Sequence, residues 1–444
     1  MSGALLQLVA YGAQDVYLTG QPQVTLFRSS YKRHTNFAME TSQQTVSGNM
    51  TSGGLTSVVI RRTGDLVSDM FVVLQSNQQG TSSYNPLVSS NGSNGVDMCW
   101  VAQRAFSQVE LYIGGQLIDR HYQLWFRLYA EVFMSETKKH VYGKMASSPV
   151  VNNTVNAAKS YVYLPLLFFF NRDPGLALPL IALQYHEVRM DFTLSSQYSQ
   201  YFGSNPFSVW ANYIYLDTAE RDLFANKKHE YLIEQVQHIQ GDPISSPGEF
   251  APSTIRLSFN HPVKELVWCY QYQDTANNPD SLWNFTSNIL GANGGYITCG
   301  SSTVTFMEHA GCPVEANIFV SEDGAEEYRD NDYTTVGPLY SFGLLFNGQQ
   351  RMAPQLGKYY NQYQPFQYHS GNPYPGIYVY SFALKPEQLQ PSGTCNFSRI
   401  NQIETVASLK SGVVATAARS QQMFAVNYNV LKIASGLGGL AFSN

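Results

Sequence analysis

Short hydrophobic runs separated by turn-forming residues fill most of the chain from Val24 onward. The runs are rich in β-branched and aromatic residues and are bounded by Gly, Asn, Ser or Pro, a pattern typical of an all-β sandwich. Gly114 and Gly115 stand between two strand-like halves and predict a two-residue hairpin turn, because glycine tolerates the positive φ that such turns need. The clearest predicted strands lie within 55–62, 69–75 and 107–122.

Two segments depart from this pattern. Residues 76–97 are polar, rich in Gly, Ser and Asn, and without period, so a long loop is expected there. Residues 122–134 have the length of a helix, and Leu124, Leu128 and Val132 recur at i, i+4 and i+8. We expect a short helix whose apolar face packs against the sandwich.

The second half of the chain repeats the first. Residues 183–194 resemble 398–409 at an offset of 215, whereas the hairpin at 113–116 resembles 346–349 at an offset of 233. The first half is therefore 18 residues longer between hairpin and late strands, and the predicted helix is expected to supply most of this excess. A duplicated domain is the simplest explanation. The offset of 215 also relates 212–216 to 427–431, and Tyr163 to Tyr378.

The repeat divides the chain into four parts. We expect an N-terminal arm, a first sandwich, a charged linker and a second sandwich. Their predicted bounds are 1–23, 24–216, 217–228 and 229–444.

The composition is poor in charge and rich in aromatic side chains. Charged residues make up 13% of the 444 residues, against roughly 25% in an average soluble protein, while aromatic residues reach 14% with 30 Tyr and 25 Phe. This balance favours a β-rich protein with large buried surfaces. A net charge of −5 provides no basic surface for a phosphate backbone, so no direct nucleic-acid partner is expected.

Targeting signals and disulfide patterns are absent from the sequence. The longest apolar run, 161–170, contains Pro165 and has half of the roughly 20 residues that a membrane-spanning helix requires. The N-terminal residues lack the basic region of a secretory signal peptide. The five cysteines are far apart and form no C-x-x-C motif. We therefore expect free thiols in a reducing, cytosolic compartment.

Long segments spread along the chain resemble the double jelly-roll major capsid protein of nucleocytoplasmic large DNA viruses, as in chloroviruses. The first, 5–38, reads LLQLVAYGAQDVYLTGQPQVTLFRSSYKRHTNFA, and the second, 113–122, reads IGGQLIDRHY. The others are FFNRDPGLALPLIALQYHEVRM at 169–190, CNFSRI at 395–400 and FAVNYNVLKIASGLGGLAFSN at 424–444.

The resemblance implies a fold and a function. It implies two tandem eight-stranded jelly-roll β-sandwiches with short helices in loops, and three chains that form a pseudo-hexagonal capsomer of an icosahedral shell. The arm would lie at the capsomer base and meet minor capsid proteins or the inner lipid membrane, and the long polar loops would form the outer towers. Assembly would take place in the host cytoplasm. No catalytic residue, cofactor or metal is implied.

Catalytic and metal-binding motifs offer little against this interpretation. The sequence has no nucleophile elbow, phosphate loop or zinc helix. His309 and Cys312 lie close together but have no further clustered ligand, and the neighbours His186 and Glu187 would face opposite sides of a strand. The acidic stretch 321–332, with its paired Glu326 and Glu327, lacks the alternating ligands of a calcium loop, so a solvated loop is expected.

Two further interpretations concern sugars. Among the N-x-[ST] sequons, Asn91 and Asn284 lie in polar segments and are the candidate glycosylation sites, whereas Asn396 is expected to be structural. The alternative function is a tandem β-sandwich lectin, because jelly rolls also bind carbohydrate and the Tyr-rich segment 359–380 offers stacking surfaces such as Tyr363 and Tyr368. An enzyme is a distant third.

Overall fold

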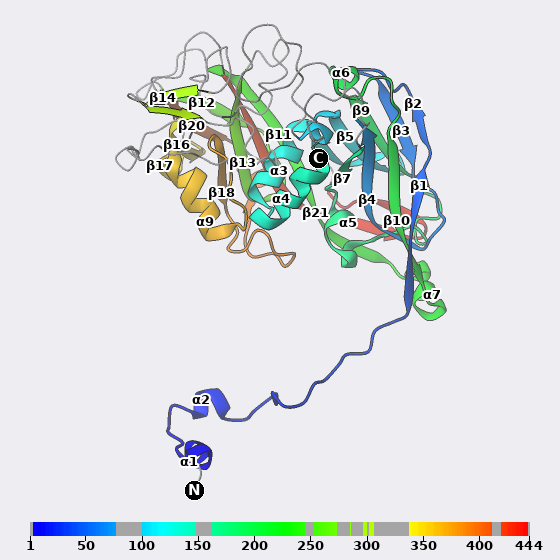
Figure 1. Cartoon of the computed structure of the whole chain (residues 1–444), viewed down its shortest axis with the longest axis vertical. Helices are drawn as coiled ribbons and strands as arrows, with labels where there is room; N and C mark the ends of the chain where they lie inside the picture. The colour runs from blue at the N-terminus through cyan, green and yellow to red at the C-terminus, as the bar shows by residue number, and fades with distance from the viewer. Residues whose placement is uncertain are drawn as a thin grey trace. The chain divides into compact units, whose positions relative to one another are not determined.

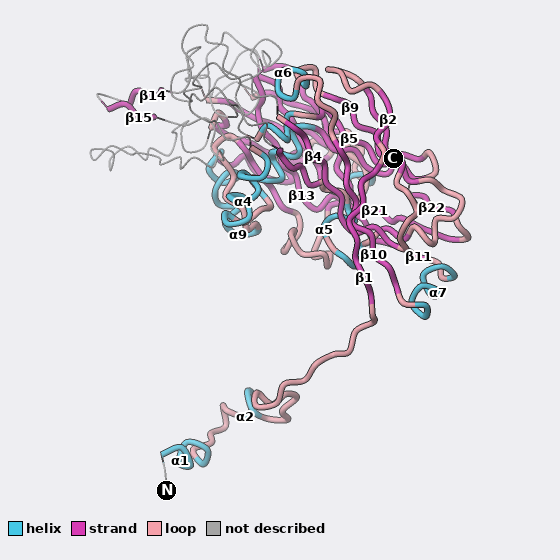
Figure 2. The backbone as a smooth tube through the Cα atoms, turned by 45° about the vertical axis from the view of Figure 1, so that its right-hand side comes forward, coloured by secondary structure: helices cyan, strands magenta, loops and turns pink. Residues whose placement is uncertain are grey.

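The fold is described from a computed structural model of the chain (Figures 1 and 2). The chain divides into two compact units, Met1–Phe37 and Ala38–Asn444, and each is described by itself. The described residues are 3–76, 100–147, 161–244, 252–272, 285, 296–299, 302–305, 337–410 and 419–442.

The first unit is short and exposes its apolar side chains. It contains the helices α1 (Gly3–Val9) and α2 (Val16–Thr19), neither of which buries a residue. Local hydrogen bonds shape it, since Asp15 accepts from the backbone N–H of Gly12 at 2.8 Å. Its exposed large apolar residues include Leu5, Leu6, Leu8, Val9, Tyr17, Leu18, Leu26 and Phe27.

The second unit begins with a jelly roll of two antiparallel sheets. One sheet has the order β1 (Phe37–Gln44), β10 (Ser208–Leu216), β4 (Leu66–Gln75) and β7 (Tyr161–Pro165), with β8 (Leu178–Pro179) also pairing β4. The other has the order β2 (Val46–Gly48), β3 (Leu55–Val59), β9 (Val188–Leu194), β5 (Phe106–Ile113) and β6 (Gln116–Tyr122). Its helical segments are η1 (Val101–Arg104), α3 (Gln123–Val132), α4 (Glu136–Ala146), α5 (Phe169–Arg172), η2 (Pro174–Leu176) and α6 (Tyr198–Phe202).

A second jelly roll follows the helix α7 (Thr218–Asn226), which lies in the predicted linker. One sheet has the order β11 (His229–Ile244), β21 (Arg419–Ala434), β13 (Pro262–Tyr272) and β18 (Ile377–Ser381), extended by β19 (Cys395–Asn396) and β22 (Leu437–Leu440). The other has the order β12 (Ser253–Leu257), β20 (Ile403–Leu409), β16 (Leu339–Phe346) and β17 (Gln349–Leu356). Its remaining elements are the hairpin β14 (Tyr296–Cys299) and β15 (Ser302–Thr305), the π-helix η6 (Tyr359–Tyr363), α9 (Gln364–Tyr368) and η7 (Phe397–Arg399).

The two jelly rolls have the same topology, which confirms the predicted all-β class and the duplication. The order β1-β10-β4-β7 recurs as β11-β21-β13-β18, and β3-β9-β5-β6 recurs as β12-β20-β16-β17. The same strands are therefore central and the same strands lie at the edges in both.

The residue register repeats with the strand order. Val109 pairs Phe192 in the first jelly roll, and Phe342 pairs Ala407 in the second, so the predicted offsets of 233 and 215 are both confirmed in these strands. Both ladders also carry an irregularity at matching places, between Phe106 and Gln108 and between Leu339 and Ser341. A bulge at the same position reflects a shared backbone design rather than a local accident.

The offset of 215 is wrong by one residue in the neighbouring sheet. Ala211 pairs Met70, and both are buried inside the first jelly roll. The corresponding pair in the inner core of the second jelly roll is Ala425 with Leu266. Ala425 lies 214 residues after Ala211, so the offset of this strand is 214 and not 215. A slip of one residue exchanges the two faces of a strand. For the same reason Tyr163 is partly exposed whereas Tyr378 is fully buried.

Both predicted hairpins are present. Gly114 and Gly115 have φ of +58° and +82°, and Asn347 and Gly348 have +50° and +77°, the left-handed pair of a primed turn. Gly114 also packs closely, because a Cβ there would lie 2.3 Å from the His186 ring.

The predicted helix is also present and explains the length difference in part. The segment between β6 and β7 has 38 residues, and that between β17 and β18 has 20, a difference of 18. The shorter segment still contains η6 and α9. The excess therefore reflects the addition of α4 and the residues around it more than that of α3, whose apolar face is buried as expected.

Candidate functional site: the seam between the jelly rolls

The sheet β11-β21-β13-β18 is buried on both faces. Along β13, Leu266, Trp268 and Tyr270 belong to the core inside the second jelly roll. The alternating residues Val267 and Cys269 belong instead to a core that is shared with the first jelly roll. This is why β13 reads as an almost continuous apolar run rather than as an alternating one.

Helix α3 of the first jelly roll covers the outer face of this sheet (Figure 1). Trp125 and Tyr129 lie one turn apart on the helix, and Phe133 caps its C-terminal end. The rings of Tyr129 and Phe133 stack at 5.0 Å between centroids. Trp125 is fully buried, and its ring lies 5.4 Å from that of Phe424 on β21. The seam between the jelly rolls is thus an aromatic core in its own right.

Buried ion pairs cross the seam beside these rings. Arg172 Nη1 on α5 lies 2.5 Å from Glu234 Oε2 on β11, and Lys264 Nζ lies 2.6 Å from Glu234 Oε1. Lys264 also lies 3.4 Å from Glu265 Oε1, whose other oxygen is 2.9 Å from His369 Nε2. The side chain of Lys264 is 4% exposed and that of Glu265 is 0% exposed.

The charges in this set stabilise one another. Burial opposes the charged Lys264 ammonium, but Glu265 and Glu234 outweigh it and raise the pKa of Lys264. Burial likewise opposes the Glu265 carboxylate, but Lys264 and then His369 lower the pKa of Glu265. Both groups are therefore charged at neutral pH, so removal of either partner leaves an uncompensated buried charge.

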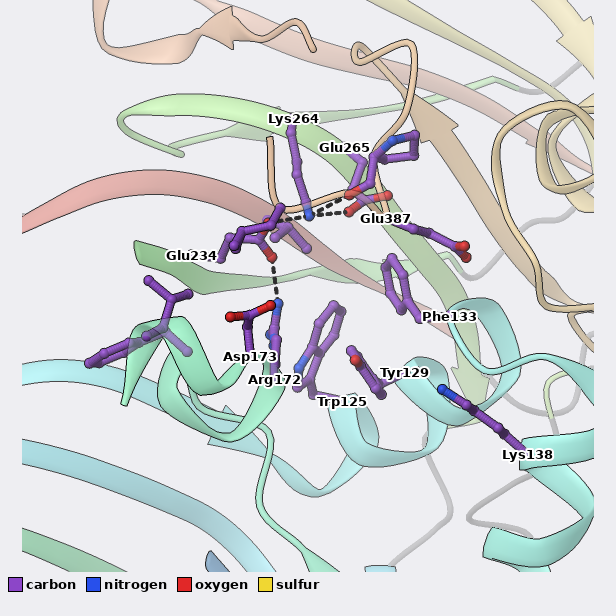
Figure 3. Close-up of a pocket in the computed structure, with 15 residues that line it drawn as sticks. Trp125, Tyr129, Phe133, Lys138, Arg172, Asp173, Glu234, Lys264, Glu265 and Glu387 are labelled. Atoms are coloured by element: carbon purple, nitrogen blue, oxygen red, sulfur yellow. Dashed lines mark hydrogen bonds and ion pairs between the residues drawn. The ribbon is translucent and has the colours of Figure 1, made fainter. Parts of the chain in front are cut away.

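A cavity of about 320 Å³ opens between these groups (Figure 3). Figure 3 shows the α3 aromatic rings on one side and the ion pairs of Glu234, Lys264 and Arg172 on the other. Both jelly rolls contribute to its wall. The lining residues are Trp125, Tyr129, Phe133, Lys138, Phe169, Arg172, Asp173, Leu176, Glu234, Lys264, Glu265, Pro386, Glu387, Leu389 and Val426.

The described residues hold neither a metal-binding cluster nor a Cys269 thiol of lowered pKa. Among them, no group of three or more His, Cys, Asp or Glu side chains is placed to hold a metal ion. Burial raises the pKa of the Cys269 thiol, which disfavours its nucleophilic form. No helix in the described part of the chain is long and apolar enough to span a bilayer.

The residues singled out from the sequence do not meet at the seam. His186 has a structural contact with β22, because its Nδ1 lies 2.8 Å from the carbonyl oxygen and 3.1 Å from the backbone nitrogen of Gly438. Asn396 accepts from the N–H of Ser398 at 3.1 Å and caps η7. The residues that lie outside the described ranges are Asn91, Asn284, His309, Cys312 and the acidic stretch 321–332 with Glu326 and Glu327.

Sequence reasoning missed the ion pairs of the seam. Lys264 and Glu265 interrupt an apolar strand, and charged residues at strand positions that read as buried indicate partners supplied by tertiary structure. That signal was available. The identity of the partners was not, because Arg172, Glu234 and His369 come from distant parts of the chain.

Comparisons with known proteins agree along the whole chain. A family model described as the major capsid protein N-terminus matches residues 25–217, and one described as the large eukaryotic DNA virus major capsid protein matches residues 220–439. The major capsid protein of Paramecium bursaria Chlorella virus 1 is 41% identical over 100% of both chains. That of Pyramimonas orientalis virus is 37% identical, again over 100% of both.

Solved structures have the same architecture. A chain in a quasi-atomic model of the PBCV-1 virus capsid superposes with a TM-score of 0.74 and 37% identity, covering 95% of this chain and 100% of that one. The Faustovirus major capsid protein superposes with a TM-score of 0.66 at 15% identity, covering 97% of this chain and 96% of that one. At that identity the second likeness shows the fold alone. Both confirm the double jelly roll.

Proposed function

Because the chain belongs to the major capsid protein family of large eukaryotic DNA viruses and is a component of the virion capsid, we propose that it assembles as a homotrimer whose six jelly rolls form a pseudo-hexagonal capsomer. The observation that carries this proposal is the duplication, with the same strand order in both jelly rolls. Three copies of a doubled domain present six similar lobes, so a three-fold particle fits a position with six neighbours. The comparisons support the capsid function and give no support to the lectin alternative.

The mass and outline of the native particle test the trimer. Light scattering on protein released from virions is expected to give about three chain masses, and negative-stain images of the same fractions a hexagonal outline. A monodisperse monomer at high concentration would overturn the proposal.

We propose that the domain bounds follow the repeat, with jelly rolls at 24–216 and 229–444, a linker at 217–228 and an arm at 1–23. The two family models divide the chain between residues 217 and 220, which supports a linker there. The first compact unit extends further than the proposed arm, to Phe37. Limited proteolysis is expected to cut first before residue 38; resistance there would contradict an exposed arm.

The arm is proposed to bind minor capsid proteins at the capsomer base. Its exposed apolar side chains, such as Leu8, Tyr17 and Leu18, support a role as a binding segment, since such a run is unfavourable in water. Capsomers without residues 1–23 are expected to remain trimeric but to lose the minor proteins in pull-downs from infected-cell extracts. If the truncated capsomers still bind the minor capsid proteins, or if they lose only bound lipid, the arm does not bind these proteins.

We also propose three further properties of the protein. The protein assembles in the host cytoplasm, has no enzymatic activity, and carries glycans at Asn91 and Asn284. The sequons support the glycan sites. Peptide mass spectrometry of virion protein tests them directly, and unmodified Asn91 and Asn284 peptides would refute them. Immunogold labelling of capsid intermediates inside the nucleus would refute cytoplasmic assembly.

A further inference from the structure

The first jelly roll has an apolar sheet face that is partly exposed. On the outer face of β1-β10-β4-β7, Trp210 lies directly opposite Phe71, and Tyr163 lies opposite Val73. The rings of Phe71 and Tyr163 approach to 6.1 Å between centroids. Tyr163 is 40% exposed, whereas the alternating residues of the same strands point into the sandwich and are buried.

The equivalent positions of the second jelly roll are buried within the chain. The inner faces of the two sheets can be aligned through their paired strands. In this alignment Trp210 corresponds to Phe424, Phe71 to Val267 and Tyr163 to Ile377. All three residues of the second jelly roll belong to the core that is shared with the first. Trp125 on α3 is the ring that covers Phe424.

The second jelly roll has a helical segment at the place of α3, and two of its aromatic side chains are exposed. Helix α3 follows β6, the second strand of the first hairpin, and η6 with α9 follows β17, the second strand of the other. On this segment Tyr363 is 54% exposed and Phe366 is 84% exposed. Strand β17 itself is exposed along almost its whole length.

We propose that Tyr363 and Phe366 on η6-α9 of one chain pack on the outer sheet face of a second copy, against Phe71, Tyr163 and Trp210. This contact repeats between chains the seam that α3 makes within one chain. The inference rests on the proposed trimer and assigns the surfaces that hold it. The second jelly roll of each chain contacts the first jelly roll of the next chain. This head-to-tail contact forms a closed ring of three copies.

The seam between chains differs chemically from the seam within a chain. The first-jelly-roll positions equivalent to Lys264 and Glu265 are Ser68 and Asp69, so the lysine of the buried set is not repeated. The contact between chains therefore lacks this cation and relies mainly on aromatic side chains. Its surfaces are exposed before assembly, and aromatic side chains provide apolar area without a desolvated charge. We expect trimer dissociation to depend little on salt concentration.

Substitution of exposed side chains tests the inference without disturbing the core. The double variant Phe366→Glu, Tyr363→Ser is expected to be a monomer in light scattering. Its circular dichroism spectrum is expected to match that of the wild-type protein, and it is expected to keep a cooperative thermal transition. Tyr163→Glu on the opposite surface is expected to do the same. Leu384→Glu is the matched control, since Leu384 is an exposed apolar residue of the second jelly roll outside this surface.

The outcomes separate this inference from the proposed function. If wild-type protein is trimeric and the Phe366→Glu, Tyr363→Ser variant remains trimeric, the surface is assigned wrongly although the trimer stands. If wild-type protein is monomeric, both proposals fall.

A chemical cross-link gives a second, independent readout. A chain that carries both Tyr163→Cys and Phe366→Cys, treated with a short bismaleimide, is expected to yield covalent trimers on a denaturing gel. Each single variant controls for the native cysteines. If the double variant is trimeric in solution but yields only monomers on the gel, the assignment is overturned.

Discussion

At the scale of single residues, Lys264 is the centre of the seam. Its ammonium group bridges Glu234 and Glu265, and it also donates to the carbonyl oxygen of Pro386 at 2.8 Å. Surface pairs between long side chains contribute little, but breaking a buried pair leaves a charge that water no longer solvates. One residue thus joins strands of the second jelly roll to Arg172 of the first through the shared carboxylate of Glu234.

Replacement of Lys264 by Met is expected to lower the free energy of unfolding by about 3–5 kcal/mol, because Glu265 then stays buried without its cation. Urea denaturation measures the difference. Lys432→Met provides the matched control, since Lys432 pairs with Glu230 at the surface and its loss should cost no more than about 1 kcal/mol. Equal effects of the two substitutions would contradict a stabilising role of the buried set.

Glu265 gives this set a defined pH dependence. Its pKa in the folded chain lies below the ordinary value of 4.5, because Lys264 and His369 outweigh burial. A carboxyl with a lowered pKa stabilises the fold above the ordinary value, and the stabilisation disappears as the pH falls through the lowered one. We expect wild-type protein to lose stability more steeply below pH 4.5 than Glu265→Gln does. Parallel slopes in acid urea titrations would contradict this.

At the scale of elements, the two hairpins share a backbone but not their surroundings. A side chain at Gly114 meets the His186 ring at 2.3 Å, whereas a side chain at Gly348 meets nothing within 4 Å. Both glycines have positive φ, so alanine is strained in either turn. Gly114 is the first residue of its turn and Gly348 is the second, so the two share a positive φ but differ in turn position and in their contacts.

Gly114→Ala is therefore expected to destabilise the chain more than Gly348→Ala does. Backbone strain of about 1–2 kcal/mol applies to both substitutions, and overpacking against His186 adds about 1–3 kcal/mol in the first turn alone. Paired chemical denaturation curves measure the difference. If the two variants are equally stable, His186 moves aside at no cost and the close packing of this turn has no energetic role.

The elements also show what the sequence could and could not predict. Strands, hairpins and α3 follow from local patterns, which is why Gly114, Gly115 and the helix at 122–134 were placed correctly. The offset of 215 failed by one residue in β10 and β21, because few side-chain identities mark the register there. The seam could not be predicted, since the partners of Lys264 are brought to it only by packing of the two jelly rolls.

At the scale of the whole molecule, the jelly rolls share one core. Val267, Cys269, Phe424 and Val426 belong to the same cluster as the interior of the first jelly roll. The second jelly roll alone would expose this face to water, although it keeps its own inner core. Cooperative unfolding follows, because neither half can lose its structure without uncovering apolar area of the other.

We expect the residues 38–444 to unfold in a single calorimetric transition. A fragment of residues 229–444 is expected to aggregate or to lack a fixed tertiary structure, as judged by size exclusion and near-ultraviolet circular dichroism. Two separate transitions in the long chain, together with a monodisperse and ordered fragment, would show that the jelly rolls are independent.

The matching bulges in the two jelly rolls bear on the origin of the molecule. The irregularities after Phe106 and Leu339 occupy the same place in the same ladder, although few side chains around them agree. An inserted residue of this kind is inherited with its backbone. We infer that the bulge predates the duplication, which makes the ancestor a single jelly roll. Fusion of two copies then brought the contact with the buried pair of Glu234 and Lys264 inside one chain.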